Sequence, residues 1–286
     1  MPVNIRKIEE YFFRVLMLLC TCIIALALLV IIFSILKKGL PSLSWSILTQ
    51  TPKGGFYFGK EGGILNAIVG SLYLAFGATL ISLLIGVPVA LYMNVHLVKR
   101  NKLVNALRFL LDLLWGIPSI VYGAFAFSIM IYLGMRTSLL AGMLTVALFI
   151  IPITIRAMDE ILRTVPRGLL EASLSVGATR GETAYKVFIR QSFPGLVTAM
   201  LLSFGRAIGD AAAVLFTAGF TDSIPTSIFQ PTATLPLSIF FQLGSPMEEV
   251  KNRAYAAAVV LTLIVLILSV ATRFASRSFR KNSIKF

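Results

Sequence analysis

The chain has 286 residues, of which 57% are hydrophobic and only 13% are charged. Soluble proteins have about 45–50% apolar and about 25% charged residues, so the composition excludes an ordinary soluble domain. The formal net charge of +14 would suggest a nucleic-acid partner in a soluble protein. In a membrane protein, the positions of Lys and Arg must be examined before that total is interpreted.

Six apolar segments follow one another along the chain, and each is long enough for the roughly 20 residues of a membrane crossing. We therefore expect an all-α, polytopic membrane protein with six transmembrane helices and both termini on one side. A cleavable signal peptide is not expected, because the first segment is longer than the roughly 7–15 apolar residues of a signal. The six segments are 15–36, 67–94, 109–134, 138–157, 195–220 and 254–272.

The basic residues are unevenly divided between the two sides. Eighteen of the 26 Lys and Arg residues lie in the two chain ends and in the connections 95–108 and 154–194, whereas seven lie on the opposite side. Because cytoplasmic segments carry the excess of Lys and Arg, both termini are expected in the cytoplasm, and topology accounts for the charge without a nucleic-acid partner. The expected parts are a cytoplasmic tail 1–14, a transmembrane domain 15–272 with a cytoplasmic loop 158–194, and a basic cytoplasmic tail 273–286.

The long inner loop contains signals for two helices. Thr164 can cap a first helix, and Gly177 stands where a glycine would end it. Thr179 lies three residues before Glu182, which is the spacing of a capping box, and predicts a second helix that runs to Pro194. The sequence thus predicts a rigid cytoplasmic protrusion, although a loop that only packs under its own bundle is an equal alternative.

The stretch "EASLSVGA", residues 171–178, resembles the EAA motif in the permease subunits of importer-type ABC transporters. It departs from that motif at Ser173, where a second Ala is usual, and at Arg190, where a Pro commonly closes the motif. The resemblance implies an ABC importer permease fold and a coupling helix that docks on a separate ATPase subunit. The coupling residues that it implies are Glu171, Ala172, Gly177 and Ala178.

Four stretches are similar to the phosphate branch of that family: "GIPSIVYGAF" at 116–125, residues 151–179, "GRAIGDAAAVLFTAG" at 205–219 and "LPLSIF" at 235–240. The similarity implies the permease subunit of an ATP-driven phosphate importer in a bacterial inner membrane. It also implies a heterodimer with a homologous permease subunit, two ATPase subunits and an external phosphate-binding protein. ATP and Mg would be used by the ATPase subunits, so this chain would be no enzyme and would bind no cofactor.

Residues that carry catalysis are scarce. The stretch "GGFYFGK", residues 54–60, matches the first seven positions of a phosphate loop, but Glu61 replaces the Ser or Thr that contacts Mg²⁺. His96 is the single histidine, so a histidine-based metal cluster or nucleophilic triad is not expected. His96 is instead expected at the membrane interface, and Cys20 and Cys22 are expected to fill space in the first span.

Arg206 and Asp210 lie four residues apart in the middle of the fifth apolar segment. An Arg at the centre of a membrane helix costs roughly 2.5–3.5 kcal/mol and normally faces the bundle interior or a water-filled cavity. We expect the two to pair, and a passing anion to compete with Asp210 for Arg206. The alternative is that the pair only fastens the helix to its neighbours, helped by a close-packing surface at Gly205 and Gly209.

Other candidates lie near the ends of the spans. Pro118 frees a carbonyl in the third span, so Pro118 and Ser119 are candidates for a kink that lines the path, with a purely structural kink as the alternative. Arg156 precedes Glu160 by four residues, a spacing that favours an interfacial anchor over a part of an inner gate.

The same spacing pairs Asp112 with Arg108 as a second anchor. On the outer side, residues 235–243 predict a short helix lying at the surface, either as part of an outer gate or of a receptor for a binding protein, or equally as a cap over the bundle. Two other functions stay open: transport of another oxyanion such as sulfate or molybdate, because charge alone does not distinguish them, and a membrane signalling scaffold whose inner loop contacts a regulator.

Overall fold

The computed structural model describes residues 5–53, 62–97 and 101–280, and every regular element in these ranges is a helix. The all-α prediction is therefore confirmed over the part of the chain that the structure describes. The elements are α1 Ile5–Gly39, α2 Trp45–Thr49, α3 Leu65–Leu91, π-helical η1 Tyr92–His96, α4 Asn101–Gly116, α5 Ser119–Tyr132, α6 Leu139–Leu162, α7 Arg167–Ser175, α8 Arg180–Glu182, π-helical η2 Thr183–Ile189, α9 Arg190–Ile208, α10 Leu235–Leu243 and α11 Glu248–Arg280.

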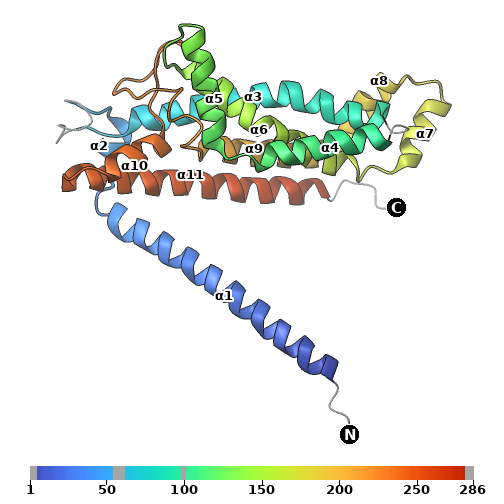
Figure 1. The fold of residues 1–286 in the computed structure, drawn as a ribbon, viewed down its shortest axis with the longest axis horizontal. Helices are drawn as coiled ribbons and strands as arrows, with labels where there is room; N and C mark the ends of the chain where they lie inside the picture. The colour runs from blue at the N-terminus through green and yellow to red at the C-terminus, as the bar shows by residue number, and fades with distance from the viewer. Residues whose placement is uncertain (1–4, 54–61, 98–100, 281–286) are drawn as a thin grey trace.

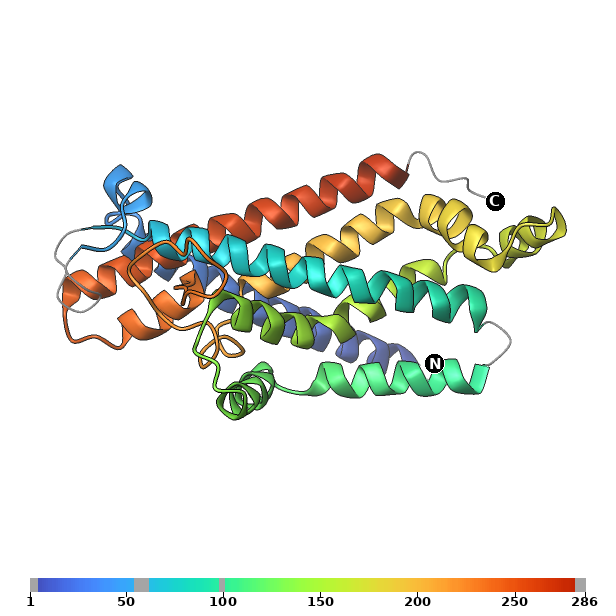
Figure 2. The same cartoon turned by 90° about the horizontal axis from the view of Figure 1, so that it is seen from above.

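A long bundle of α3, α6, α9 and α11 forms the core, with α7 and α8 at one end and α2 and α10 at the other (Figures 1 and 2). Small residues let these helices approach closely, because Ala75 and Ala78 of α3 are fully buried in the cluster that also contains Ile150 of α6. The start of α1 and the end of α11 both lie toward the α7 end of the bundle (Figure 1). This placement agrees with an even number of crossings.

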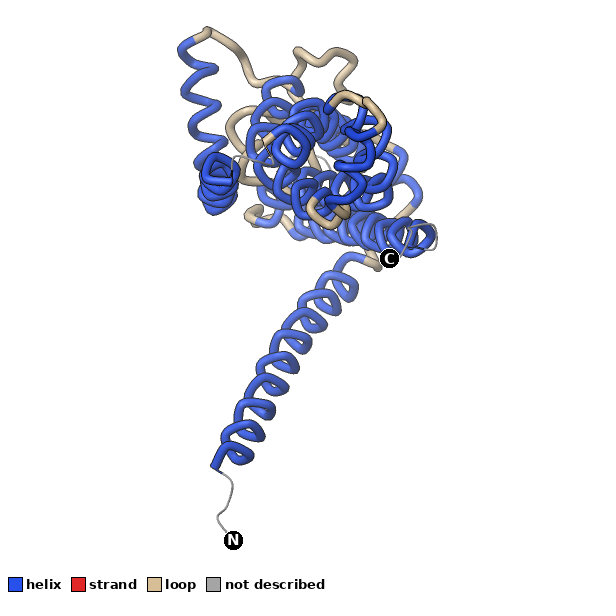
Figure 3. The backbone as a smooth tube through the Cα atoms, turned by 90° about the vertical axis from the view of Figure 1, so that its right-hand side faces the viewer, coloured by secondary structure: helices blue, strands red, loops and turns tan. Residues whose placement is uncertain are grey.

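Helix α1 stands apart from the bundle and meets α11 near its own last turn (Figure 3). There, Lys38 Nζ donates to Tyr255 Oη at 3.2 Å, and a Cβ on Gly39 would lie 2.5 Å from the carbonyl oxygen of Tyr255. Cys20 and Cys22 are exposed on α1, so they do not fill space within this chain. The apolar surface of α1 is left for lipid or another subunit.

The third apolar segment, 109–134, is not one straight span. Helices α4 and α5 meet at a bend of 90°, and Pro118 caps the start of α5. Because Pro118 has no N–H, the carbonyl of Leu114 loses its helical partner, and it accepts instead from Tyr122 Oη at 2.8 Å and from Ile117 N at 3.2 Å. The kink predicted at Pro118 is confirmed, and protein groups satisfy the freed carbonyl.

The fifth segment, 195–220, is not one helix either. Helix α9 passes through Pro194, where a new span was expected to begin, and ends at Ile208, which is buried. An irregular chain follows up to α10. The prediction was wrong because apolar composition marks residues that are kept from water, and it does not require them to be helical.

Non-helical backbone at membrane depth must find partners within the protein. Here the carbonyl of Thr217 accepts from Ser138 N at 3.0 Å, and the carbonyl of Ala218 accepts from Thr232 N at 2.9 Å. The side chains of Thr217 and Ala218 are fully buried. The irregular segment is thus a packed part of the core, and its hydrogen bonds connect the start of α6 with the residues just before α10.

Helix α10 has the predicted bounds, and the hydroxyl of Thr234 accepts from Leu237 N at its start. It is not a surface helix, because Leu235 and Leu237 are fully buried. Ser71 of α3 also accepts a hydrogen bond from Leu235 N at 2.7 Å. The helix therefore closes the bundle against α3 and α11.

Candidate functional site

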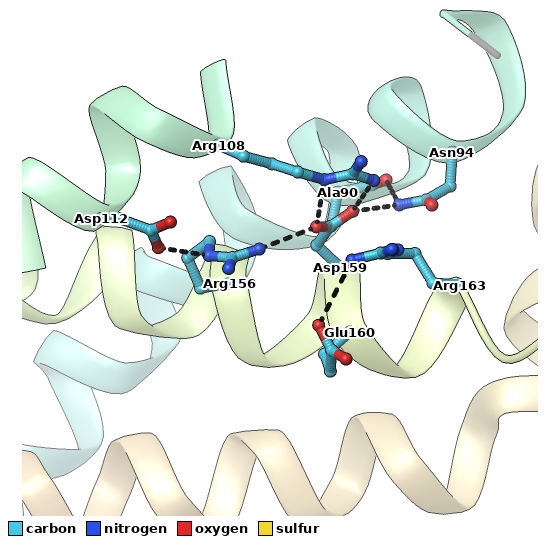
Figure 4. A network of polar contacts seen from close by, with 8 residues as sticks. All are labelled: Ala90, Asn94, Arg108, Asp112, Arg156, Asp159, Glu160 and Arg163. Carbon is cyan, nitrogen blue, oxygen red and sulfur yellow. Dashed lines mark hydrogen bonds and ion pairs between the residues drawn. The ribbon is translucent and has the colours of Figure 1, made fainter. Parts of the chain in front are cut away.

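The carboxylate of Asp159 is fully buried near the α7 end of α6. It accepts from Arg108 Nε at 2.8 Å and Nη2 at 3.0 Å, from Asn94 Nδ2 at 2.8 Å, and from Arg156 Nη1 at 3.2 Å (Figure 4). A buried charge is tolerated when it is paired and its lone pairs are hydrogen-bonded. This network therefore ties η1 and α4 to α6 around one carboxylate.

The anchors expected along single helices are replaced by pairs between helices. Arg156 Nε donates to Asp112 Oδ1 at 2.6 Å, so neither the Arg156–Glu160 pair nor the Arg108–Asp112 pair forms. Glu160 lies 3.7 Å from Arg163 instead. Arg108 pairs with the buried Asp159, and Arg156 lies between Asp159 and Asp112, so these contacts join α4 to α6.

Asp159 was missed from the sequence, although a signal for it exists. It lies four residues after Ile155 and three residues before Leu162, both of which are buried on α6. The 3.6-residue period of a helix therefore places Asp159 on the buried face. An acidic residue on such a face needs cationic partners from other elements.

Arg206 lies in the last turn of α9, and its guanidinium is 5.0 Å from the ring centroid of Phe149. That ring packs on Tyr122 of α5 at 5.6 Å between centroids. Arg206 and Asp210 do not form an ion pair, because α9 ends at Ile208 and the i, i+4 geometry is lost. Asp210 Oδ2 instead accepts from Ala213 N at 2.7 Å, which stabilises the irregular segment.

Other predicted path residues fall into two groups. Ser119 and Pro118 begin α5, whose Tyr122 contacts Phe149, so the structure brings this bend and Arg206 to one aromatic pair. Arg156 belongs to the Asp159 network, which lies nearer the α7 end. The expected close packing at Gly205 and Gly209 does not form within this chain, since a Cβ on Gly205 would meet no atom within 4 Å.

The end of α7 has the predicted glycine. Gly177 has φ +85°, a left-handed conformation that favours glycine. Its N–H donates to the carbonyl of Leu174 at 3.1 Å, and Ala178 N donates to Ser173 at 3.2 Å. This pair of bonds is a Schellman motif. Glu171 and Ala172 are exposed on the same helix.

One of the two helix starts predicted in the inner loop is confirmed. At α8, Glu182 N donates to Thr179 Oγ1 at 3.2 Å, and Thr179 N donates to Glu182 Oε2 at 3.0 Å, which completes a capping box. The cap predicted at Thr164 is wrong, because α7 begins after Pro166. The hydroxyl of Thr164 donates back to the carbonyl of Ile161 at 2.7 Å.

The α7–η2 segment is fastened to the end of α3. Arg180 Nη1 donates to the carbonyls of Val95 and His96, both at 3.0 Å, at the end of η1. The hydroxyls of Ser173 and Thr183 are hydrogen-bonded at 2.9 Å and join α7 to η2. Ser173, which departs from the EAA pattern, thus makes a contact that Ala cannot make.

The remaining sequence candidates add no chemistry. The phosphate-loop-like stretch 54–60 and the Glu61 that follows it lie outside the described residues. In the part of the chain that the structure describes, no group of three or more His, Cys, Asp or Glu side chains could hold a metal ion. His96 is exposed and stacks on Tyr92 at 5.1 Å.

Long apolar helices, a buried irregular segment and a helical protrusion fastened to one end of the bundle define a multi-pass membrane protein. Residues 82–281 match the family described as binding-protein-dependent transport system inner membrane component. The chain belongs to this family, whose members are permeases.

Among its relatives, the phosphate transport system permease protein PstA of Haemophilus influenzae is 34% identical over 244 residues, which cover 85% of each chain. The PstA of Pasteurella multocida is 33% identical over 246 residues, with the same coverage. The probable ABC transporter permease protein YqgI of Bacillus subtilis is 32% identical over 285 residues, covering 94% of this chain and 95% of that one.

Solved structures share the fold. A chain of the inward-facing MetNI methionine ABC transporter matches with a TM-score of 0.63 at 22% identity, covering 75% of this chain and 95% of that chain. A chain of a bacterial alginate ABC transporter in complex with its periplasmic protein matches with a TM-score of 0.59 at 14% identity, covering 97% of each chain. Both are chains of ABC transporters.

Replacing Asp159 with Asn should destabilise the protein by about 3–5 kcal/mol, because Arg108 and Arg156 lose a buried counter-charge. Asp112→Asn is the matched control and should cost about 1 kcal/mol or less, because Asp112 is 48% exposed. Thermal unfolding of the detergent-extracted protein measures both. Equal unfolding temperatures for the two variants would contradict the role of Asp159.

Proposed function

We propose that this chain is a permease subunit of an ATP-driven phosphate importer. The observation that carries the proposal is its identity of 32–34% to phosphate transport system permease proteins over about 85% of the chain. The excess of Lys and Arg at the α7 end orients the protein in a bacterial inner membrane with both termini and the α7–η2 segment in the cytoplasm.

The proposed complex contains a homologous permease subunit, two ATPase subunits and an external phosphate-binding protein. The family description, which refers to binding-protein-dependent transport, and the likeness to multi-subunit transporters support this composition. The ATPase subunits use ATP and Mg²⁺, and this chain transmits their motion without a cofactor of its own.

The contacts of the α7–η2 segment support a route for that motion. Glu171, Ala172, Gly177 and Ala178 form the proposed docking surface at the tip. A displacement of the tip pulls on η1 through Arg180, and it also moves α9, because η2 continues into α9 without a break. Helix α9 carries Arg206, so the route ends at the candidate substrate contact.

Arg206 is the proposed phosphate contact. Its guanidinium faces an aromatic ring and forms no hydrogen bond or ion pair with any described residue. It therefore offers all five N–H donors to an oxyanion. A cation–π contact with Phe149, of about 0.5–2 kcal/mol, holds the guanidinium in place of the ion pair with Asp210, and it occupies none of the N–H donors.

The other path candidates take supporting positions. Pro118 and Ser119 set the direction of α5, whose Tyr122 supports the ring beneath Arg206. Arg156 sits between Asp112 and Asp159, so we assign it to the inner end of the path, where it joins α4 to α6. Asp210 acts on the path by holding the irregular segment after α9.

Arg206→Gln should lower phosphate uptake by about ten-fold or more while the complex still assembles, because hydrogen bonds to a charged group contribute about 1.5–3 kcal/mol. Asp210→Asn should have a smaller effect, since Asn also accepts the hydrogen bond from Ala213 N. Uptake of labelled phosphate by cells that express each variant measures this. Normal assembly with unchanged uptake in Arg206→Gln would defeat the assignment.

Gly177→Val should reduce the amount of ATPase subunit that co-purifies with the chain, because a β-branched residue cannot easily adopt φ +85°. Gly181→Val is the matched control, since Gly181 is exposed on α8, has no positive φ and meets no atom within 4 Å. Retained ATPase binding and activity in Gly177→Val would remove the α7–η2 segment from the coupling route.

A further inference from the structure

A cavity of about 240 Å³ lies between η1, α4, α6 and α7, on the side of the Asp159 network that faces the α7 end. Three arginines from three helices line it: Arg108 of α4, Arg163 at the end of α6 and Arg167 at the start of α7. Asn94 lies beside them, and Leu162 and Phe188 supply apolar walls. The transport proposal does not use this cavity.

The three guanidinium groups have donors to spare. Arg108 binds Asp159 through Nε and Nη2, which leaves its Nη1 free of hydrogen bonds. The contact of Arg163 with Glu160, at 3.7 Å, is too long for a hydrogen bond. Arg167 makes no hydrogen bond or ion pair with any described residue. Arg167 also begins α7, so the positive end of that helix lies at the cavity.

The local charge favours an anion. The three acidic side chains that face these arginines are Asp112, Asp159 and Glu160, and they are outnumbered by four arginines once Arg156 is included. Asp159 is already saturated by Arg108, Arg156 and Asn94, and Glu160 is 69% exposed on its side chain. An excess of one positive charge therefore remains around the cavity, together with guanidinium N–H groups that make no hydrogen bond.

We propose that this cavity binds a phosphate group, held by Arg108, Arg163 and Arg167. Phosphate oxygens match the paired N–H donors of guanidinium groups, which explains a preference for this ligand over a monovalent halide. Two sources share this chemistry: free inorganic phosphate in the cytoplasm and the headgroup of an anionic lipid in the adjoining leaflet, since basic pockets between transmembrane helices bind such headgroups.

Binding at this cavity would have a mechanical consequence. The ligand would contact α4, α6 and α7 together and would restrain α7 against the bundle. The site is separate from Arg206, so it does not depend on the route that phosphate takes through the membrane. It gives the cytoplasmic face a means to adjust the coupling segment.

The test uses the full-length chain extracted in a neutral detergent with the subunits that accompany it. The midpoint of thermal unfolding is followed against inorganic phosphate in one arm and short-chain phosphatidylglycerol in the other, with chloride and short-chain phosphatidylcholine as references. Arg163→Gln with Arg167→Gln removes two of the donors. Lys186→Gln with Arg190→Gln is the matched control, because both residues are exposed at the same end and lie outside the cavity.

At least one probe should raise the midpoint of the wild type and of the control, and the arm that responds identifies the source. The probe concentration that gives half of the maximal rise in the unfolding midpoint should be at least about ten-fold higher in the double variant Arg163→Gln with Arg167→Gln than in the wild type. Failure of both probes on the wild type, or an equal response in that variant, would overturn the proposal. If the double variant does not fold, Arg167→Gln alone is judged by the same criterion, since Arg167 is exposed and unbonded.

Discussion

The buried carboxylate of Asp159 is the interaction on which the α7 end of this permease depends. A charge without water must be surrounded by donors, and here the donors come from η1, from α4 and from Arg156, which precedes Asp159 by three residues on α6. The requirement fixes where α4 lies, because Arg108 reaches Asp159 only when that helix runs along α6 (Figure 4). The position of α4 in turn directs the bend at Pro118 and the course of α5.

From this fixed region, two connections lead to the rest of the molecule. Toward the α7 end, Arg180 fastens the α7–η2 segment to the end of η1. In the other direction, η2 continues into α9, which carries Arg206 in its last turn beside the ring of Phe149. The proposed coupling surface on α7 and the proposed substrate contact on α9 are thus joined through α8 and η2, and α9 ends at the buried Ile208, where the irregular chain begins.

Several features that depend on neighbouring residues could be predicted from the sequence, whereas contacts between residues far apart in the sequence could not. The turn at Gly177, the capping box at Thr179 and the kink at Pro118 each depend on residues within four positions, and all three are confirmed. The end of α9 was missed because apolar composition reports burial and not helicity. The pair of Arg156 with Asp112 was missed because a pair across two helices leaves no spacing in the sequence. Its contact with Asp159 has the i, i+3 spacing of one helix, and the helical period places Asp159 on a buried face.

The most direct test of phosphate import is ATP hydrolysis by the complete complex reconstituted in lipid vesicles with its external binding protein. The account predicts that hydrolysis rises when the binding protein carries phosphate, and that it does not rise when sulfate or molybdate is supplied instead. Stimulation by another oxyanion, with none by phosphate, would contradict the assignment. A rate that responds to no oxyanion would contradict a role in transport.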